Sequence, residues 1–265
     1  METTLLPQLL KPIDEKEIDK YLSDRRYGAQ EKKDGKRMFV QTLALIHTKA
    51  FNRKGISVDV PDCFVEAGIH FAARNKFNNY LFDGEKVGEK FYIFDSLQLG
   101  SKYIRNLPYK ERYAILQIQL MEKPFELLPL AITTKDKRAL YKRLKKEGKE
   151  GIVFKRLDAP YTPGRSTTQV KCKFYSTASF IVTKINSKRS VGVSLYKGSK
   201  LVDHGNCTVP PNFKMPAIDD IVEIRMLYAY KDGCLCQPVY LGERDDIYEE
   251  DCTTKQLRYK NENNN

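Results

Sequence analysis

Four short segments of this 265-residue chain combine lysines with acidic side chains, and such sets can do chemistry on phosphates. A lysine amine attacks an electrophile once it is neutral, and basic side chains can neutralise phosphate oxygens. Carboxylate oxygens are ligands that Mg²⁺ prefers. Each segment alone also fits an ordinary charged turn or strand, since Asp-Gly pairs favour turns. The segments are Glu31–Arg37 (EKKDGKR), Asp83–Glu85 (DGE), Glu150–Lys155 (EGIVFK) and Lys171–Lys173 (KCK).

Together, and in this order, the segments resemble the ordered motifs of the covalent nucleotidyltransferase superfamily. That superfamily contains ATP-dependent DNA ligases, RNA ligases and mRNA capping enzymes. Asn52–Gly55 (NRKG) looks like its early arginine motif, and Tyr161–Ser166 (YTPGRS) resembles a segment that DNA ligases place before their last lysine motif. Arg244–Ile247 (RDDI) matches the final R-x-D-K motif in part, because Ile247 stands in place of the lysine. The resemblance covers residues 5–248.

The resemblance implies that Lys32 is a nucleophile that attacks the α-phosphate of ATP and keeps AMP as a lysyl phosphoramidate. Lys33 is one residue off this position and would point to the other face of a strand. Lys171 and Lys173 are two residues apart, so they share a strand face and can converge on the α-phosphate. A lysine attacks only when neutral, so burial or neighbouring cations must favour the uncharged amine.

The resemblance also implies a nucleotide site and a metal site. Glu85 and Glu150 match the family's Mg²⁺-binding carboxylates, and Glu85 is in addition a candidate for binding the ribose hydroxyls. Phe94 matches the aromatic residue that stacks on adenine, and it also fits an ordinary core position. The other implied roles are base recognition by Glu31, phosphate contact by Arg37, leaving-group orientation by Arg244, and nucleic-acid binding by Arg53, Arg165 and Lys155.

The Tyr161–Arg165 segment and the R-x-D motif favour an ATP-dependent DNA ligase within the superfamily. Such an enzyme seals 5′-phosphate/3′-hydroxyl nicks in duplex DNA, with ATP as substrate and Mg²⁺ as cofactor. Two alternative functions use the same lysine chemistry, those of an RNA ligase and of an mRNA capping guanylyltransferase. A non-enzymatic nucleic-acid-binding module is a third alternative. The compact length resembles the minimal ligases of bacteriophages and viruses. We therefore expect a monomer in the cytoplasm, which for a phage or virus is the host cytoplasm.

The predicted fold class is α+β. Residues 1–175 mix helices with strands, and the resemblance implies an ATP-grasp-like adenylation (nucleotidyltransferase) domain of mixed and antiparallel sheets. Residues 176–250 hold alternating β-rich runs without a clear helix, which predicts a small all-β barrel. The resemblance implies that this barrel is an OB-fold. Residues 251–265 are predicted to form a polar tail.

The formal net charge of +12 permits a polyanionic partner but does not require one. Residues 101–175 alone carry +11, whereas the β-rich domain is slightly acidic and is not expected to hold DNA by bulk charge alone. Lys135–Lys149 predicts a basic helix with Thr134 as its N-cap and Gly148 as its end. Its basic face fits either a solvated surface or a phosphate-contacting one.

The sequence offers no support for a membrane protein or a zinc protein. It has no apolar run of the roughly 18 residues that a membrane span needs. Its N-terminus lacks the basic-then-apolar order of a signal peptide. The six cysteines form no C-x-x-C pair, so the usual zinc spacing is missing.

Overall fold

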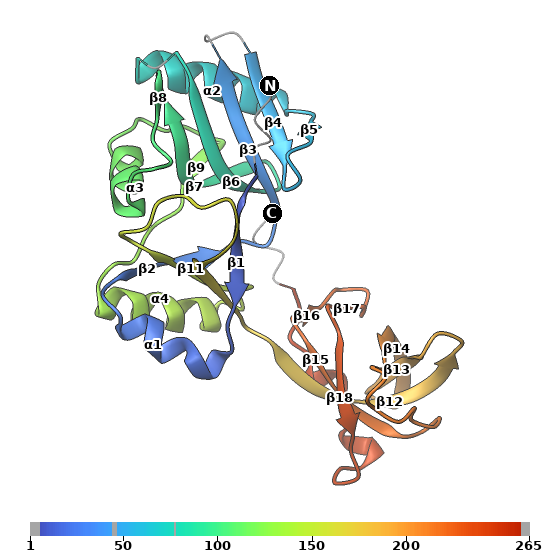
Figure 1. The fold of residues 1–265 in the computed structure, drawn as a ribbon. Helices are drawn as coiled ribbons and strands as arrows, with labels where there is room; N and C mark the ends of the chain where they lie inside the picture. Colours follow the sequence, from blue (N-terminus) through green and yellow to red (C-terminus); the bar gives the residue numbers. More distant parts are fainter. Residues whose placement is uncertain (1–5, 44–46, 77, 261–265) are drawn as a thin grey trace. The chain divides into compact units, whose positions relative to one another are not determined.

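The computed structural model describes residues 6–43, 47–76 and 78–260. The chain divides into two compact units, of which the first ends at Lys173 and the second begins at Phe174 (Figure 1). The domain boundary predicted after residue 175 lies close to this division. No helix within the described ranges is long and apolar enough to cross a membrane.

One sheet of the first unit carries most of the lysine motifs and has the strand order β1–β11–β10–β2. The strand β1 runs parallel to β11, and the other neighbours are antiparallel. Because β10 lies between β11 and β2, it brings the lysines at the ends of both strands together. The strands are β1 (Gln8–Pro12), β2 (Tyr27–Lys32), β10 (Gly151–Arg156) and β11 (Gly164–Lys173).

A second sheet of the first unit has the order β5–β4–β3–β6–β7–β8, and β9 pairs in parallel with β7. The Asp-Gly-Glu segment lies on β6, and Phe94 lies on its neighbour β7. The strands are β3 (Lys36–Leu43), β4 (His47–Asn52), β5 (Ser57–Val58), β6 (Tyr80–Val87), β7 (Lys90–Leu99), β8 (Lys102–Tyr103) and β9 (Phe125–Leu127).

Helices pack on both sheets of the first unit (Figure 1). The helices α1 and α4 lie against β2, and α4 also contacts β10. The helix α2 packs on β3 and β4, and α3 packs on β7. The helices are α1 (Ile18–Ser23), which follows the 3-10 turn Glu15–Glu17, α2 (Asp62–Arg74), α3 (Tyr109–Gln117) and α4 (Thr134–Lys146).

The main core of the first unit lies between α2 and the second sheet. Phe64, Ala67 and Phe71 recur at the spacing of one helix face and are buried. Phe64 packs against Phe91 and Phe71 against Phe82, with ring centroids 5.6 and 5.0 Å apart. Full burial of such a side chain contributes about 1.5–3 kcal/mol, so this aromatic cluster anchors the sheet that carries Glu85 and Phe94.

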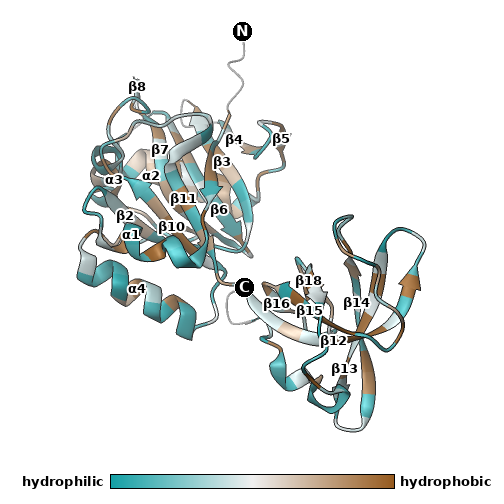
Figure 2. Cartoon of the chain, turned by 60° about the horizontal axis from the view of Figure 1, so that its bottom comes forward, coloured by the Kyte–Doolittle hydropathy of each residue, from teal (hydrophilic) through white to brown (hydrophobic). Residues whose placement is uncertain are grey.

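The predicted basic helix is α4, and it begins one residue earlier than expected. Thr133, not Thr134, is the N-cap, because its backbone is extended and its hydroxyl accepts the backbone N–H of Asp136 at 3.1 Å. The helix ends before Gly148, which has a φ of +63°, a value that glycine adopts without strain. Figure 2 shows that the surface of α4 is mostly hydrophilic.

One lysine of α4 is a structural residue. Lys137 is fully buried, and burial lowers the pKa of its ammonium group. Its Nζ donates to three backbone carbonyls at 3.0, 2.7 and 2.9 Å, those of Tyr21, Asp24 and Tyr27. These carbonyls surround the end of α1, so Lys137 fastens α4 to the chain before β2.

Further basic side chains of α4 pair with acidic residues near α1. Arg138 pairs with Asp19 at 2.9 Å, and Lys145 pairs with Glu15. Lys142 and Arg143 are exposed. The helix is therefore neither a purely solvated face nor a purely phosphate-binding one, because part of its charge holds the first unit together.

The second unit has a sheet of order β14–β13–β12–β15–β18 and a small pair, β16–β17. On β15 the buried residues Val222, Ile224 and Met226 alternate with partly exposed ones, as one-sided burial of a strand requires. The edge strands β14 and β18 contact each other, so the sheet curls upon itself, but they are not paired as neighbours in the strand order of the described residues. The strands are β12 (Ser176–Asn186), β13 (Ser190–Lys197), β14 (Lys200–Thr208), β15 (Ile221–Met226), β16 (Tyr228–Ala229), β17 (Leu235–Cys236) and β18 (Val239–Glu243).

Residues 251–260, predicted to belong to a polar tail, pack onto the second unit instead. Cys252 is fully buried in its core, and Leu257 packs against the same cluster. Two isolated bridges, Tyr196 with Thr253 and Ala229 with Tyr259, tie the segment to the strands. The apolar residues within this polar stretch therefore extend the second unit beyond residue 250. Residues 261–265 of the predicted tail lie outside the described residues.

Replacing Lys137 with methionine keeps the length of the side chain but leaves three buried carbonyls without their donor. We expect Lys137→Met to lower the free energy of unfolding by about 1–3 kcal/mol. Lys142→Met, on the exposed part of the same helix, should change it by less than about 0.5 kcal/mol. Urea denaturation followed by circular dichroism measures both. Equal losses in the two variants would contradict the structural role of Lys137.

Candidate active site

A buried carboxylate joins two lysines from strands on either side of β10. Lys32 ends β2 and Lys173 ends β11, and both pair with Gly151 at the start of β10. Glu150 precedes Gly151 and so lies between the lysines. Its Oε2 is 2.5 Å from Lys32 Nζ, and its Oε1 is 2.8 Å from Lys173 Nζ. The Glu150 side chain is only 4 % exposed, so both ammonium groups neutralise a charge that water hardly reaches.

The close approach of these strands depends on Gly151. A Cβ atom at this position would lie 2.2 Å from the carbonyl oxygen of Cys172 on β11. A side chain here would therefore push β11 away from β10 and draw Lys173 away from Glu150. Strand packing thus explains why glycine follows the glutamate in this segment.

Lys171 adds a further cation beside this pair. Burial lowers the pKa of Lys171, and the positive charges of Lys32, Lys173 and Arg53 lower it further, whereas Glu150 raises it. Since these charges act on one another, they are close in space. A group of cations around the Glu150 carboxylate is suited to an anionic ligand such as a polyphosphate.

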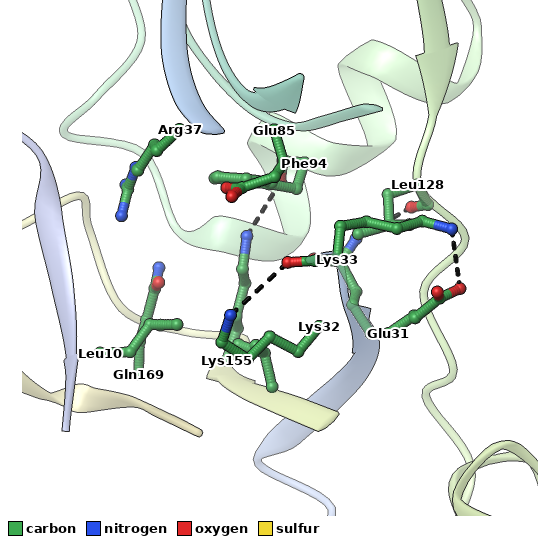
Figure 3. Close-up of a pocket in the computed structure, with 12 residues that line it drawn as sticks. Leu10, Glu31, Lys32, Lys33, Arg37, Glu85, Phe94, Leu128, Lys155 and Gln169 are labelled. Carbon is green, nitrogen blue, oxygen red and sulfur yellow. Dashed lines mark hydrogen bonds and ion pairs between the residues drawn. The ribbon is translucent and has the colours of Figure 1, made fainter. Parts of the chain in front are cut away.

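The residues around Lys32 line a pocket that has both charged and apolar side chains in its wall (Figure 3). This pocket brings together many of the residues predicted from the sequence: Glu31, Lys32, Arg37, Glu85, Phe94 and Lys155. Apolar side chains complete its wall: Leu10, Leu128 and Val153. An apolar wall beside cations fits a molecule that has a flat base at one end and phosphates at the other.

Lys33 also lines the pocket, but its ammonium group has a different partner from that of Lys32. It pairs with Glu31 at 2.9 Å and lies 4.1 Å from the ring centroid of Tyr92. In Figure 3 the Lys33–Glu31 pair lies apart from the Lys32 ammonium group. The two adjacent lysines thus differ in environment, and only Lys32 binds the carboxylate shared with Lys173.

Phe94 and Lys155 line the pocket next to each other. Lys155 Nζ donates to the Phe94 carbonyl at 3.1 Å and lies 4.2 Å from the Phe94 ring centroid. It also lies 4.6 Å from the ring centroid of Tyr109. Burial lowers the pKa of Lys155 to about 7. Sequence reasoning assigned Lys155 to nucleic-acid binding, whereas its burial in this pocket favours contact with a ligand that enters the pocket.

Two carboxylates lie near Lys32, of which Glu85 lines the pocket and Glu150 pairs with the lysine. Glu85 lies opposite Arg37 on the neighbouring strand β3. Burial raises the pKa of Glu85 to about 7, and the negative charge of Glu150 adds to this rise while Lys32 and Arg37 oppose it. Glu85 and Glu150 are therefore close enough to interact.

This pair of carboxylates fits Mg²⁺ better than zinc. In the described part of the chain no group of three or more His, Cys, Asp or Glu side chains forms a metal site. Mg²⁺ does not need such a group, because one or two carboxylates commonly hold it together with phosphate oxygens and water. Glu85 and Glu150 can supply these carboxylates.

The other predicted residues do not line this pocket. Glu150, Lys171 and Lys173 belong to the charged group around Lys32 instead, and the three remaining arginines lie elsewhere. Arg53 is exposed in the turn between β4 and β5, and Arg165 is exposed near the start of β11. In the second unit, Arg244 pairs with Asp246 at 2.5 Å and with Glu223 at 3.1 Å. Ile247, which replaces the lysine of the family motif, packs against the core of that unit. The predicted roles of the three arginines stay predictions.

Sequence reasoning missed several residues that line or support the pocket. Val153 could have been found, because it is two residues from Lys155 and thus shares its strand face. Gln30 could also have been found, since it is two residues before Lys32 on β2. Leu10 and Gln169 gave no signal, because the pairing of β1 with β11 joins segments more than 150 residues apart in the sequence.

Relatives identified by sequence are DNA ligases. Residues 71–173 match the family model described as ATP dependent DNA ligase domain. A DNA ligase of Nanoarchaeum equitans is 35 % identical over 92 residues, which are 32 % of this chain and 16 % of that protein. DNA ligase 1 of Korarchaeum cryptofilum is 39 % identical over 83 residues, which are 30 % of this chain and 15 % of that protein. The matched segments are thus a small part of these longer relatives.

Solved ligase structures share the fold. The ligase domain of M. tuberculosis LigD superposes with a TM-score of 0.55 at 17 % identity, covering 96 % of this chain and 99 % of that one. A Lig E DNA ligase superposes with a TM-score of 0.62 at 17 % identity, covering 91 % and 99 %.

The fold is therefore the α+β nucleotidyltransferase fold of ligases, and the predicted fold class is confirmed. More specifically, residues 71–173 match the model of an ATP-dependent DNA ligase domain, in agreement with the resemblance found in the sequence. The matched segment includes Glu85, Phe94, Glu150, Lys171 and Lys173. Lys32 precedes it and is linked to it in space through Glu150.

The raised pKa of Glu85 predicts a measurable dependence of stability on pH. Between pH 4.5, the ordinary pKa of the side chain, and about 7, the folded protein binds a proton that the unfolded chain has released. The free energy of unfolding should therefore fall as the pH rises through this window. Glu85→Gln should remove this part of the slope. Urea titrations of both proteins from pH 5 to 8 test it, and parallel slopes would contradict the assignment.

Proposed function

We propose that this chain is an ATP-dependent DNA ligase that seals 5′-phosphate/3′-hydroxyl nicks in duplex DNA. The observation that carries the proposal is the placement of Lys32 beside Glu150 and Lys173 and at the wall of a pocket that Glu85 and Phe94 also line. An ATP-dependent DNA ligase domain in the same chain supplies the substrate class. DNA ligase is also the printed name of the sequence relatives.

In the first step the Lys32 amine attacks the α-phosphorus of ATP. The new bond joins Nζ to phosphorus, the bond to the bridging oxygen breaks, pyrophosphate leaves, and the amine loses a proton. An ammonium nitrogen has no lone pair, so before attack Lys32 must pass one proton to the Glu150 carboxylate, 2.5 Å away, and then leave this contact. The proton that the amine loses on forming the bond to phosphorus goes to solvent. The phosphates of ATP offer Lys32 and Lys173 other anionic partners in place of Glu150.

We assign the two ends of the nucleotide to different residues of the site. The adenine ring stacks on Phe94 beside Lys155, while the α-phosphate lies between Lys32 and the lysines of β11. Glu31, at the rim of the pocket, contributes to recognition of the base. Phosphoryl transfer of this kind depends mainly on positioning and on neutralising the phosphate oxygens.

Mg²⁺ is the metal that we assign to Glu85 and Glu150. When bound, the ion supplies positive charge against the phosphate oxygens and helps to orient them. The raised pKa of Glu85 means that this carboxyl ionises near neutral pH, so metal binding and deprotonation of Glu85 favour each other.

In the second step a 5′-phosphate oxygen at the nick attacks the phosphorus of lysyl-AMP, and the bond to Lys32 breaks. In the third step the 3′-hydroxyl attacks the activated 5′-phosphate, a phosphodiester forms and AMP leaves.

Arg53 and Arg165, which are exposed, are assigned to the DNA strand near the nick. Arg244 is assigned to the pyrophosphate leaving group of the first step. We expect the enzyme to act as a monomer in the cytoplasm.

A panel of nicked duplexes tests the proposed substrate. With ATP and Mg²⁺, the protein should seal a nick between DNA strands at least tenfold faster than nicks with RNA on either side. Preference for RNA strands would favour an RNA ligase. Transfer of GMP from GTP to a diphosphate RNA end would favour a capping enzyme. If the protein reacted with none of these substrates, the result would favour a non-enzymatic nucleic-acid-binding module.

Lys32→Ala separates the chemical steps. This variant should lose sealing of a nick with a 5′-phosphate, because lysyl-AMP cannot form. It should still seal a nick that already carries AMP on its 5′ end, because the third step does not use the lysine as a nucleophile. Lys33→Ala is the matched control and should keep sealing of the 5′-phosphate nick. Sealing of that nick by Lys32→Ala would overturn the assignment.

A further inference from the structure

A buried network behind the pocket joins Arg37 to a tyrosine that the proposed reaction does not use. Arg37 binds Asp83 through two hydrogen bonds, Nε to Oδ1 at 2.9 Å and a terminal nitrogen to Oδ2 at 2.6 Å. The Tyr161 hydroxyl donates to the same Oδ2 at 2.8 Å. Asp83 is 0 % exposed, so these partners replace water around its charge.

The N-terminal strand β1 closes the network into a ring. The backbone N–H of Gln8 donates to the Tyr161 hydroxyl at 2.9 Å, and its carbonyl accepts from Arg37 at 2.7 Å. Burial and the negative charge of Asp83 raise the pKa of Tyr161, so its hydroxyl stays protonated and able to donate. The ring of Tyr161 packs with Phe39 and Leu81 of the second sheet, which fixes the direction of the hydroxyl.

Two residues connect this network to the pocket. Arg37 itself lines the pocket, and its Cζ lies 5.3 Å from the ring centroid of Phe94. Leu10, two residues after Gln8 on β1, also lines it. Asp83 holds the guanidinium group of Arg37 in place. Tyr161 holds β1, the strand that carries Leu10, through the backbone N–H of Gln8.

We propose that Tyr161 is a positioning residue, which acts through Asp83 to aim Arg37 at the nucleotide and to keep β1 as a wall of the pocket. This role rests on the proposed function of the site. Without the hydroxyl, Asp83 keeps only Arg37, and the buried N–H of Gln8 loses its acceptor. The guanidinium group and β1 can then shift, and both changes act on the pocket that receives ATP.

Tyr161→Phe removes one oxygen atom and is the direct test. The apparent KM for ATP in lysine adenylation should rise about tenfold, as loss of one charge-linked hydrogen bond implies, with the maximal rate changed by less than about threefold. Tyr80→Phe is the matched control, since Tyr80 is a buried tyrosine on the same strand as Asp83, within the core under α2. It should leave the KM for ATP unchanged.

A double-mutant cycle tests the route of the effect. In an Asp83→Asn background, Tyr161→Phe should change the KM for ATP by less than about twofold, because its partner charge is already gone. Independent tenfold effects in the two backgrounds would overturn action through Asp83. An unchanged KM in Tyr161→Phe, or equal changes in Tyr161→Phe and Tyr80→Phe, would overturn the positioning role.

A measurement without ATP separates this role from the ligase proposal. The Nε–H signal of Arg37 in ¹⁵N NMR should be sharp in the wild type and in Tyr80→Phe, and broadened or shifted in Tyr161→Phe. An unaltered signal in Tyr161→Phe would overturn the positioning role even if the protein adenylates. A wild-type protein with this signal but no lysine adenylate would overturn the ligase proposal instead.

Discussion

The carboxylate of Glu150 is the contact on which the arrangement of the site depends. It faces the ammonium groups of Lys32 and Lys173, which end two strands that do not pair with each other. Two ammonium groups this close would repel each other in a buried site unless an anion lay between them. Glu150 directly precedes β10, which lies between β2 and β11. The register of these three strands therefore also sets the balance of charge around Lys32. Gly151 lets those strands come together.

Internal anions hold the site together while no ligand is bound. Glu150 balances two lysines, Asp83 balances Arg37, and Glu31 balances Lys33. A triphosphate brings its own negative charge and can take over some of these cations, so binding exchanges one set of ion pairs for another. Lys32 gains from such an exchange, since release from Glu150 is needed before its amine can attack. Asp83 is too deeply buried for the same exchange and keeps Arg37 in place instead.

The sequence predicted the chemical residues better than it predicted their supports. Lys32, Glu150, Lys171 and Lys173 lie in short segments whose order along the chain resembles the motifs of a known superfamily, and this resemblance named them. Tyr161 and Asp83 meet across 78 positions of sequence, and no local pattern reports such a contact. Lys137 stood among many lysines of a basic helix, and only the structure shows the carbonyls around it. The buried place of Lys155 likewise follows from the packing of two sheets.

The lysine that carries AMP can be identified by incubating the protein with ATP and Mg²⁺, digesting it, and sequencing the peptides by tandem mass spectrometry under conditions that keep phosphoramidates intact. The contact of Lys32 with Glu150, and the separate pairing of Lys33 with Glu31, predict a single AMP adduct on Lys32. An adduct on Lys33 or Lys173, or no adduct on any lysine, would contradict this reading of the site.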